Sequence, residues 1–114
     1  MTFDAFDVVV VPFPFTDRTT SKRRPALVIS DAYSFNRKSG HVVLAMITSA
    51  KNSDWPLDTN IEDLDAAGLT SASVVRMKIF TLDTQLIIRK AGTLNVKDQA
   101  SVSEALRGML HRER

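Results

Sequence analysis

Short hydrophobic runs alternate with polar, turn-forming segments over the first half of the chain. Three runs are rich in β-branched or aliphatic residues, and each predicts a β-strand: Val8–Val11, Pro25–Ser30 (PALVIS) and Val42–Thr48 (VVLAMIT). The segment Asp31–Gly40 between the second and third runs is polar and rich in turn residues, so we expect a loop there. The pattern therefore predicts strands joined by polar connections.

Two prolines follow the first hydrophobic run, and weaker strand signals follow the third. Pro12 and Pro14 have no backbone N–H to donate, so the chain around Phe13 should leave the sheet or follow its edge. Leu64–Gly68 is long enough for one helical turn, with Gly68 as its C-cap. The later predicted strands are Leu57–Ile61, then Ser73–Val75 and Lys78–Leu82 as two short strands or one bent strand, and finally Leu86–Ile88 and Ala91–Leu94.

The C-terminal segment has the period of a helix. Asn95, followed three residues later by Asp98, resembles a helix start. Hydrophobic side chains at i, i+4, i+7 and i+8 form one helical stripe: Val102, Leu106, Met109 and Leu110. Many short strands followed by one helix predict a mainly β (α+β) domain, a small antiparallel sheet or barrel that spans residues 1–114.

Composition narrows the class of protein. The chain has 114 residues, 44% of them hydrophobic and 25% charged, which is typical of one globular domain. It contains no cysteine, which excludes disulfides and thiolate metal sites. No apolar run approaches the ~20 residues that span a membrane, and the first fifteen residues carry no Lys or Arg, unlike a signal peptide. We therefore expect a cytoplasmic protein with no membrane association.

The net charge of +2 is mild, but basic residues crowd one short segment: Arg18, Lys22, Arg23 and Arg24. On charge alone, such a segment is more typical of a solvated loop than of a nucleic-acid site. The acidic residues of the middle segment are expected to be solvated, and the sequence predicts neither a metal site nor a cofactor; they are Asp54, Asp58, Glu62, Asp63 and Asp65.

Strand pairing predicts that two polar residues meet. If the second and third runs pair as an antiparallel hairpin with Ser30 opposite Val42, the same register sets Arg24 opposite Thr48, on one face of the sheet. His41 has the opposite parity to Thr48 and would lie about 23 Å away at ~3.3 Å per residue. A histidine-based active site at Thr48 is therefore not expected.

The stretch FDVVVVPFPFTDRTTSKRRPALVIS resembles the opening of the MazF/PemK toxins of type II toxin–antitoxin systems. VVLAMITS, GLTSASVVRMKIFTLD and AGTL follow in the family's order, with a closing helix. The resemblance implies an SH3-like small barrel of the CcdB/PemK kind with a C-terminal helix. It also implies a homodimer, a cognate antitoxin and cleavage of single-stranded RNA that leaves a cyclic phosphate, without a metal.

The resemblance also implies roles for particular residues. The family's arginine before proline corresponds to Arg24, its threonine at the end of the third strand to Thr48, and its later basic residue to Arg76. Many members open the first strand with Gly-Asp, where this chain has Phe6-Asp7. One branch of the family has an Asp where this chain has Lys78, so an acid–base role does not transfer there, and Lys78 is expected to bind phosphate or to be solvated.

Metal-free RNA cleavage needs the ribose 2′-OH to attack the adjacent phosphorus in line. The planar fork of Arg24 suits the charge that develops on the phosphate oxygens, and the Thr48 hydroxyl can hold the phosphate or the 2′-OH. Phosphate contacts are expected from Lys22, Arg23 and Arg76, and base-edge contacts from Ser49 and Asn52. Phe13, Phe15 and Trp55 stack on bases or pack in the protein, and an acidic, apolar antitoxin peptide would fit the same groove.

Two other functions remain open at the level of sequence. A gyrase-binding toxin of the same fold would act through its C-terminal residues and would not need Arg24 beside Thr48. A non-catalytic barrel would bind RNA without cutting it.

Overall fold

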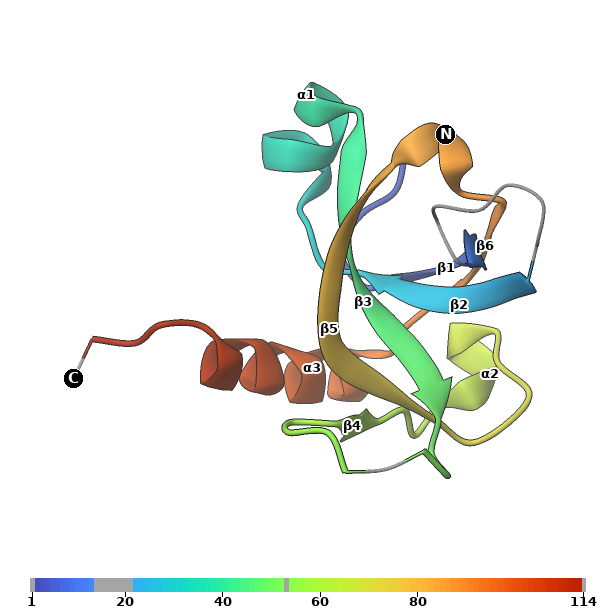
Figure 1. Cartoon of the computed structure of the whole chain (residues 1–114), viewed down its shortest axis with the longest axis vertical. Coiled ribbons are helices and arrows are strands. Elements are labelled where there is room, and N and C mark those ends of the chain that lie inside the picture. The colour runs from blue at the N-terminus through green and yellow to red at the C-terminus, as the bar shows by residue number, and fades with distance from the viewer. Residues whose placement is uncertain (1, 14–21, 53, 114) are drawn as a thin grey trace.

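The computed structural model describes residues 2–13, 22–52 and 54–113, and these form one antiparallel sheet that curls into a half-barrel (Figure 1). The strand order is β4-β5-β3-β2-β1-β6. The strands are β1 (Asp7–Phe13), β2 (Lys22–Val28), β3 (His41–Ser49), β4 (Thr59–Asn60), β5 (Ser73–Asp83) and β6 (Arg89–Thr93). The helices are α1 (Arg37–Ser39), α2 (Leu64–Ala67) and α3 (Val96–Met109), with short helical turns at Ala32–Asn36 and Thr84–Leu86. The predicted mainly β fold with a C-terminal helix is confirmed.

The predicted register between the second and third strands is confirmed. Ala26 pairs with Met46 and Val28 with Leu44, as the pairing of Ser30 with Val42 requires. The β2–β3 ladder ends at Ala26–Met46, because the start of β2 continues along β1 while the end of β3 continues along β5. The two strands spread apart at this end of the sheet (Figure 1).

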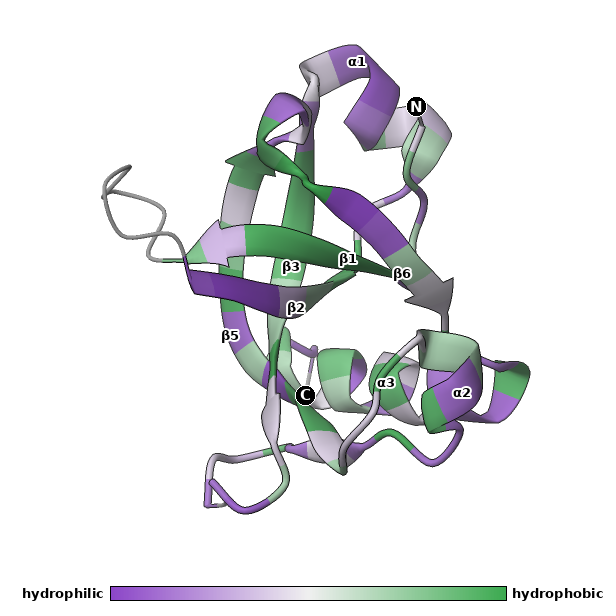
Figure 2. Cartoon of the chain, turned by 90° about the vertical axis from the view of Figure 1, so that its right-hand side faces the viewer, coloured by the Kyte–Doolittle hydropathy of each residue, from purple (hydrophilic) through white to green (hydrophobic). Residues whose placement is uncertain are grey.

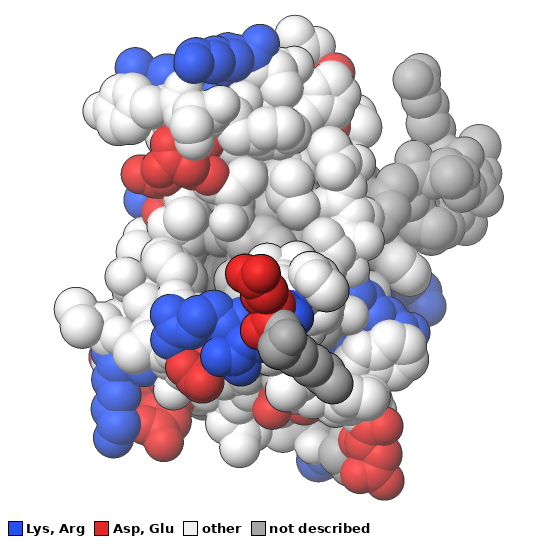
Figure 3. All heavy atoms as spheres, turned by 90° about the vertical axis from the view of Figure 1, so that its left-hand side faces the viewer, with Lys and Arg blue, Asp and Glu red and all other residues white. Residues whose placement is uncertain are grey.

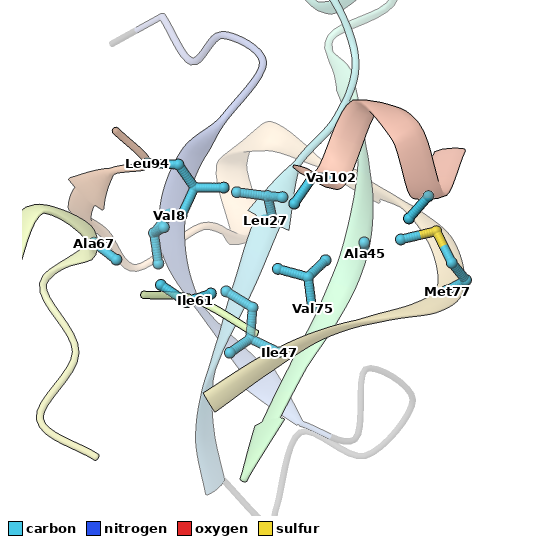
Figure 4. Packing of buried hydrophobic residues seen from close by; sticks show 11 residues of the cluster. Val8, Leu27, Ala45, Ile47, Ile61, Ala67, Val75, Met77, Leu94 and Val102 are labelled. Carbon is cyan, nitrogen blue, oxygen red and sulfur yellow. The ribbon is translucent and has the colours of Figure 1, made fainter. Parts of the chain in front are cut away.

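Alternation along the strands divides the core between the two faces of the sheet. On one face, Leu27, Ala45 and Val75 pack with Val102 of α3 (Figure 4). On the opposite face a second buried cluster contains Val9, Val11, Ala26, Val28, Val42 and Leu44. Arg24 and Thr48 have the parity of this second cluster, so both lie on its face, beyond the buried part.

Several predicted element boundaries were wrong. β1 continues through Pro12, which lies beyond the last β1–β6 pair at Val10, so Pro12 interrupts no ladder on that side. The segment Asp31–Gly40 is helical rather than a loop, because the Asp31 carboxylate accepts hydrogen bonds from two backbone N–H groups of the first turn. Thr84–Leu86 is a 3-10 turn, where a strand was expected from Leu86.

The turn before β1 explains one departure from the family pattern. Phe6 has a φ of 74°, a conformation that favours glycine. The turn is held by hydrogen bonds between Asp4 and Asp7, and the Phe6 side chain packs against the core. This chain therefore adopts a left-handed conformation at Phe6 without a glycine.

Helix α3 begins where predicted, since the Asn95 side chain caps the N–H of Asp98. Its buried face includes Asp98, Val102 and Ala105, whereas Met109 and Leu110 of the predicted stripe are exposed. The Asp98 carboxylate is itself buried and accepts hydrogen bonds from the backbone N–H groups of residues 62 and 63, which ties the helix to the segment before α2. None of the helices in the described residues is long and apolar enough to cross a membrane.

Candidate nucleic-acid interface

Arg24 lies on the polar, exposed first half of β2, and the hydrophobic second half of the strand follows it (Figure 2). It pairs across the strand with Val11, and its guanidinium lies over the Phe13 ring, 5.1 Å from the ring centroid. This stacking leaves the edge of the guanidinium available for hydrogen bonds. The neighbours Lys22 and Arg23 are exposed, whereas Asp17, Arg18 and Phe15 lie outside the described residues.

Thr48, near the end of β3, is held by a turn that follows directly. The Asn52 N–H donates to the carbonyl of Ser49, and the Asn52 side-chain amide folds back to donate to the Thr48 hydroxyl oxygen at 3.2 Å. Because that oxygen accepts this bond, the hydroxyl proton of Thr48 stays available to donate. Asn52 therefore orients Thr48, in addition to its predicted role at base edges. Ser49 is exposed beside it.

Arg76 is bound to a carboxylate that was expected to be solvated. Its Nε and Nη2 donate to the two oxygens of Asp58 at 3.1 and 2.7 Å, and the two side chains are only 13% and 16% exposed. Nη2 also donates to the carbonyl of Asn52. The hydrogen bond that Arg76 donates to Asp58 raises the pKa of Arg76 above its ordinary value. The expectation for Asp58 was therefore wrong, because Asp58 and Arg76 together hold the turn that orients Thr48.

Lys78 lies further along β5 and interacts with Trp55. Its ammonium is 4.5 Å from the centroid of the Trp55 ring, and the indole N–H donates to the carbonyl of Met77. Lys78 is exposed and Trp55 is 40% exposed, so one face of this pair is open to a ligand.

The pairing of β3 with β5 places Arg76 on the same face of the sheet as Thr48 and Arg24. Thr48 is opposite Val74 and Met46 is opposite Arg76, so Arg76 has the parity of Thr48 and of Arg24. His41 lies at the far end of β3, opposite Asp83. Arg24 and Thr48 lie two positions beyond the last β2–β3 pair, and each has its own partner, Phe13 and Asn52. Their joint contact with one phosphate remains a prediction.

Among the other acidic residues of the middle segment, Asp63 and Glu62 have described partners. Asp63 caps α2, and Glu62 forms an exposed ion pair with Lys97. No cluster of three or more metal-ligating side chains occurs among residues 2–13, 22–52 and 54–113. On the face viewed in Figure 3, basic and acidic side chains are interspersed and form no single patch.

Two residues of this region were missed by sequence reasoning. Asp58 was grouped with solvated carboxylates, because nothing in the local pattern links it to Arg76 eighteen positions later. Arg89 lines a cavity with Arg23 and Arg24, and it reaches this end of the sheet only because β6 pairs with β1. The sequence shows that Arg89 is basic, but it does not show that β6, which carries Arg89, pairs with β1.

Comparison with known proteins agrees with this architecture. The family model described as "PemK-like, MazF-like toxin of type II toxin-antitoxin system" matches residues 4–110. A chain of a MazE–MazF crystal structure from Deinococcus radiodurans has 22% identity and a TM-score of 0.74, with 99% of each chain covered. No curated protein matches the chain by sequence.

Two mycobacterial structures are also similar in fold. An endoribonuclease in complex with its cognate antitoxin, from a mycobacterial species, has 17% identity and a TM-score of 0.71, covering 97% of this chain and 98% of that one. The Mycobacterium tuberculosis toxin MazF-mt6 has 19% identity and a TM-score of 0.69, covering 90% and 93%. The family model extends over nearly the whole chain, and this protein therefore belongs to the PemK-like, MazF-like toxins of type II toxin–antitoxin systems.

Proposed function

We propose that this toxin is a metal-independent endoribonuclease that cuts single-stranded messenger RNA at specific short sequences. The observation that carries the proposal is the position of Arg24 and Thr48 on one face of the sheet, each two positions beyond the last β2–β3 pair. Each side chain also has a neighbour that fixes its orientation without consuming its donors to phosphate.

The reaction needs only the RNA, the protein and water. The ribose 2′-oxygen forms a bond to phosphorus and loses its proton to water, while the bond from phosphorus to the 5′-oxygen breaks and that oxygen gains a proton from water. The products are a 2′,3′-cyclic phosphate and a 5′-hydroxyl. Arg24 stabilises the charge on the non-bridging oxygens, and Thr48 donates to one of them. A guanidinium carries only N–H donors and no acceptor, which makes Arg24 an unsuitable base.

Further substrate contacts are proposed around Arg24 and Thr48. Lys22 and Arg23 contribute phosphate contacts near Arg24, and Ser49 and Asn52 lie beside Thr48, where they can meet base edges. Lys78 binds phosphate while it stacks on Trp55. Arg76 has one nitrogen, Nη1, without a hydrogen bond in the described residues, so its main role is to hold the turn and any RNA contact is secondary.

Incubation of the purified protein with a long single-stranded RNA in EDTA tests the proposal. Discrete cuts that end in 2′,3′-cyclic phosphate support the nuclease, whereas bound but intact RNA indicates a non-catalytic barrel. Neither binding nor cutting, together with binding to a gyrase subunit, indicates the gyrase-binding alternative.

The double variant Arg24→Ala, Thr48→Ala is expected to abolish cutting while it keeps the circular dichroism spectrum of the fold. Loss of one such donor costs ~100–1000-fold in rate. The matched control is Arg37→Ala with Thr81→Ala, which removes an arginine and a threonine from exposed positions at the other end of the sheet. Full activity of the Arg24, Thr48 variant would refute the site.

The partners are proposed from the family. A cognate antitoxin is expected to cover the RNA face, and the toxin is expected to act as a homodimer in the cytoplasm. Light scattering of the purified toxin, alone and after co-expression with the neighbouring upstream reading frame, measures both associations.

A further inference from the structure

A cavity of about 410 Å³ lies beside the candidate interface, between the start of β2, strand β6 and the α2–β5 loop. Its lining includes three arginines and three hydroxyl residues: Arg23, Arg24, Arg89, Thr70, Ser71 and Ser73. This volume is within the range of pockets that hold small ligands. We call it the Arg23–Arg89 pocket.

Strand pairing concentrates charge in this pocket. Val10 of β1 pairs with Pro25 on one side and with Arg89 on the other, and Pro12 pairs with Arg23. Residues paired in this way share a face, so Arg23 and Arg89 lie on one face of the sheet and Arg24 on the other. In the described part of the chain, neither the Arg23 nor the Arg89 guanidinium bonds to a carboxylate.

The opposite wall of the pocket is fixed by backbone packing. Gly68 has a φ of 72°, and a Cβ there would lie 2.1 Å from the carbonyl oxygen of Ala91. The reciprocal contact occurs at Gly92, where a Cβ would lie 2.3 Å from the carbonyl oxygen of Ala66. The loop is thus held against β6, which sets the Thr70 and Ser71 side chains at the pocket while Ser73 donates to the Ser71 carbonyl.

We propose that the Arg23–Arg89 pocket binds a backbone phosphate of the RNA that flanks the phosphate held by Arg24 and Thr48. Guanidinium forks and hydroxyls are the groups that bind phosphodiesters. Arg23 and Arg24 are consecutive, so an RNA strand that crosses the start of β2 meets one arginine on each face. This inference rests on the proposed nuclease function, because Arg24 links the pocket to the cutting site.

Binding of a mixed-sequence 2′-O-methyl oligoribonucleotide, which lacks the 2′-OH nucleophile, measures the pocket apart from cleavage. Arg89→Gln is expected to weaken this binding about tenfold and to reduce the slope of log K against log salt by about 0.7. Cleavage of ordinary RNA should show a rise in KM larger than the fall in kcat. The control Arg37→Gln removes the same charge from α1 and should change neither quantity.

A second variant protects the test against misfolding. Thr70→Glu adds a carboxylate on an exposed loop at the pocket and should also weaken binding by charge repulsion. Unchanged oligonucleotide binding by both variants, with wild-type circular dichroism, overturns the pocket while the nuclease stands. Loss of binding in both, for a wild type that does not cut RNA, supports the pocket and rejects the nuclease.

Binding of inorganic phosphate and of polyglutamate tests whether the pocket takes an anion other than RNA. If Arg89→Gln lowers the affinity for inorganic phosphate but leaves that for the oligonucleotide unchanged, the pocket is a free-phosphate site and the proposal is wrong. If it affects only the binding of polyglutamate, the pocket receives an acidic protein segment, which also overturns the proposal.

Discussion

The guanidinium of Arg76 donates to both carboxylate oxygens of Asp58, at 3.1 and 2.7 Å, and to the backbone carbonyl of Asn52. Asn52 in turn donates to the Thr48 hydroxyl oxygen. A charged pair thus positions a hydroxyl that it does not touch. This arrangement gives Arg76 a role in the proposed site other than direct phosphate binding.

Removal of the Asp58 carboxylate should slow RNA cleavage through Thr48. In Asp58→Ala the turn that carries Asn52 loses its anchor, so we expect a fall of about tenfold in kcat, comparable to the loss of one hydrogen bond. Single-turnover cleavage of a mapped RNA site measures it, with the exposed neighbour Asp65→Ala as control. A wild-type rate in Asp58→Ala would show that the pair has only a structural role.

Asn52 should matter through the direction of its hydrogen bond. Asn52→Ala removes the donor to Thr48, whereas Asn52→Asp replaces it with an acceptor that takes the Thr48 hydroxyl proton away from the phosphate. Cleavage should therefore fall in the order wild type, Asn52→Ala, Asn52→Asp. Asn60→Asp on β4 adds the same charge and serves as control. Equal rates for the two Asn52 variants would contradict this orientation.

Alanine substitutions at Gly68 and Gly40 distinguish the cost of backbone strain from the cost of a steric clash. Both have positive φ, 72° and 69°, but only at Gly68 would a Cβ meet another atom within 4 Å. Gly40→Ala should lower the free energy of unfolding by about 1–2 kcal/mol, the usual cost of the left-handed conformation. Gly68→Ala should cost clearly more, since α2 must move away from β6. Urea denaturation of both variants checks this difference.

Asp98 should contribute substantially to the free energy of unfolding, because its carboxylate accepts two backbone hydrogen bonds. Asp98→Ala leaves the backbone N–H groups of residues 62 and 63 without their acceptors, at a cost of roughly 2–4 kcal/mol in the free energy of unfolding. Asp98→Asn keeps one acceptor oxygen and should lose about half as much. Thermal and urea unfolding measure both, and an Asp98→Ala variant as stable as wild type would contradict the tie between α3 and this segment.

The cap at Asp31 predicts a dependence of stability on pH. Hydrogen bonds from the backbone and side chain of Ser34 hold the pKa of Asp31 below its ordinary value of about 3.9. Because the unfolded state binds the proton more readily, the cap stabilises the fold above that value and is lost as the pH falls through the folded pKa. The difference in Tm between wild type and Asp31→Ala should therefore shrink in acid. A difference that stays constant down to the acid transition would contradict it.

Sequence alone determined the features that depend on local pattern. The strands β1, β2, β3 and β5 and the helix α3 were predictable, because side-chain period and β-branched content act over neighbouring residues. The β2–β3 register was also predictable, since parity and the length of the connection fix it. That register is what placed Arg24 and Thr48 on one face.

Tertiary structure decided what depends on contacts between distant segments. The pairing of Arg76 with Asp58, the position of Arg89 across β1 from Pro25, and the close approach of Gly68 to Ala91 have no local signal. They arise because the sheet curls and brings β6 against β1 and the turn after β3 against β5. The sequence therefore determined the strands and the register that carry the polar side chains, and the curl of the half-barrel decided which of these side chains meet.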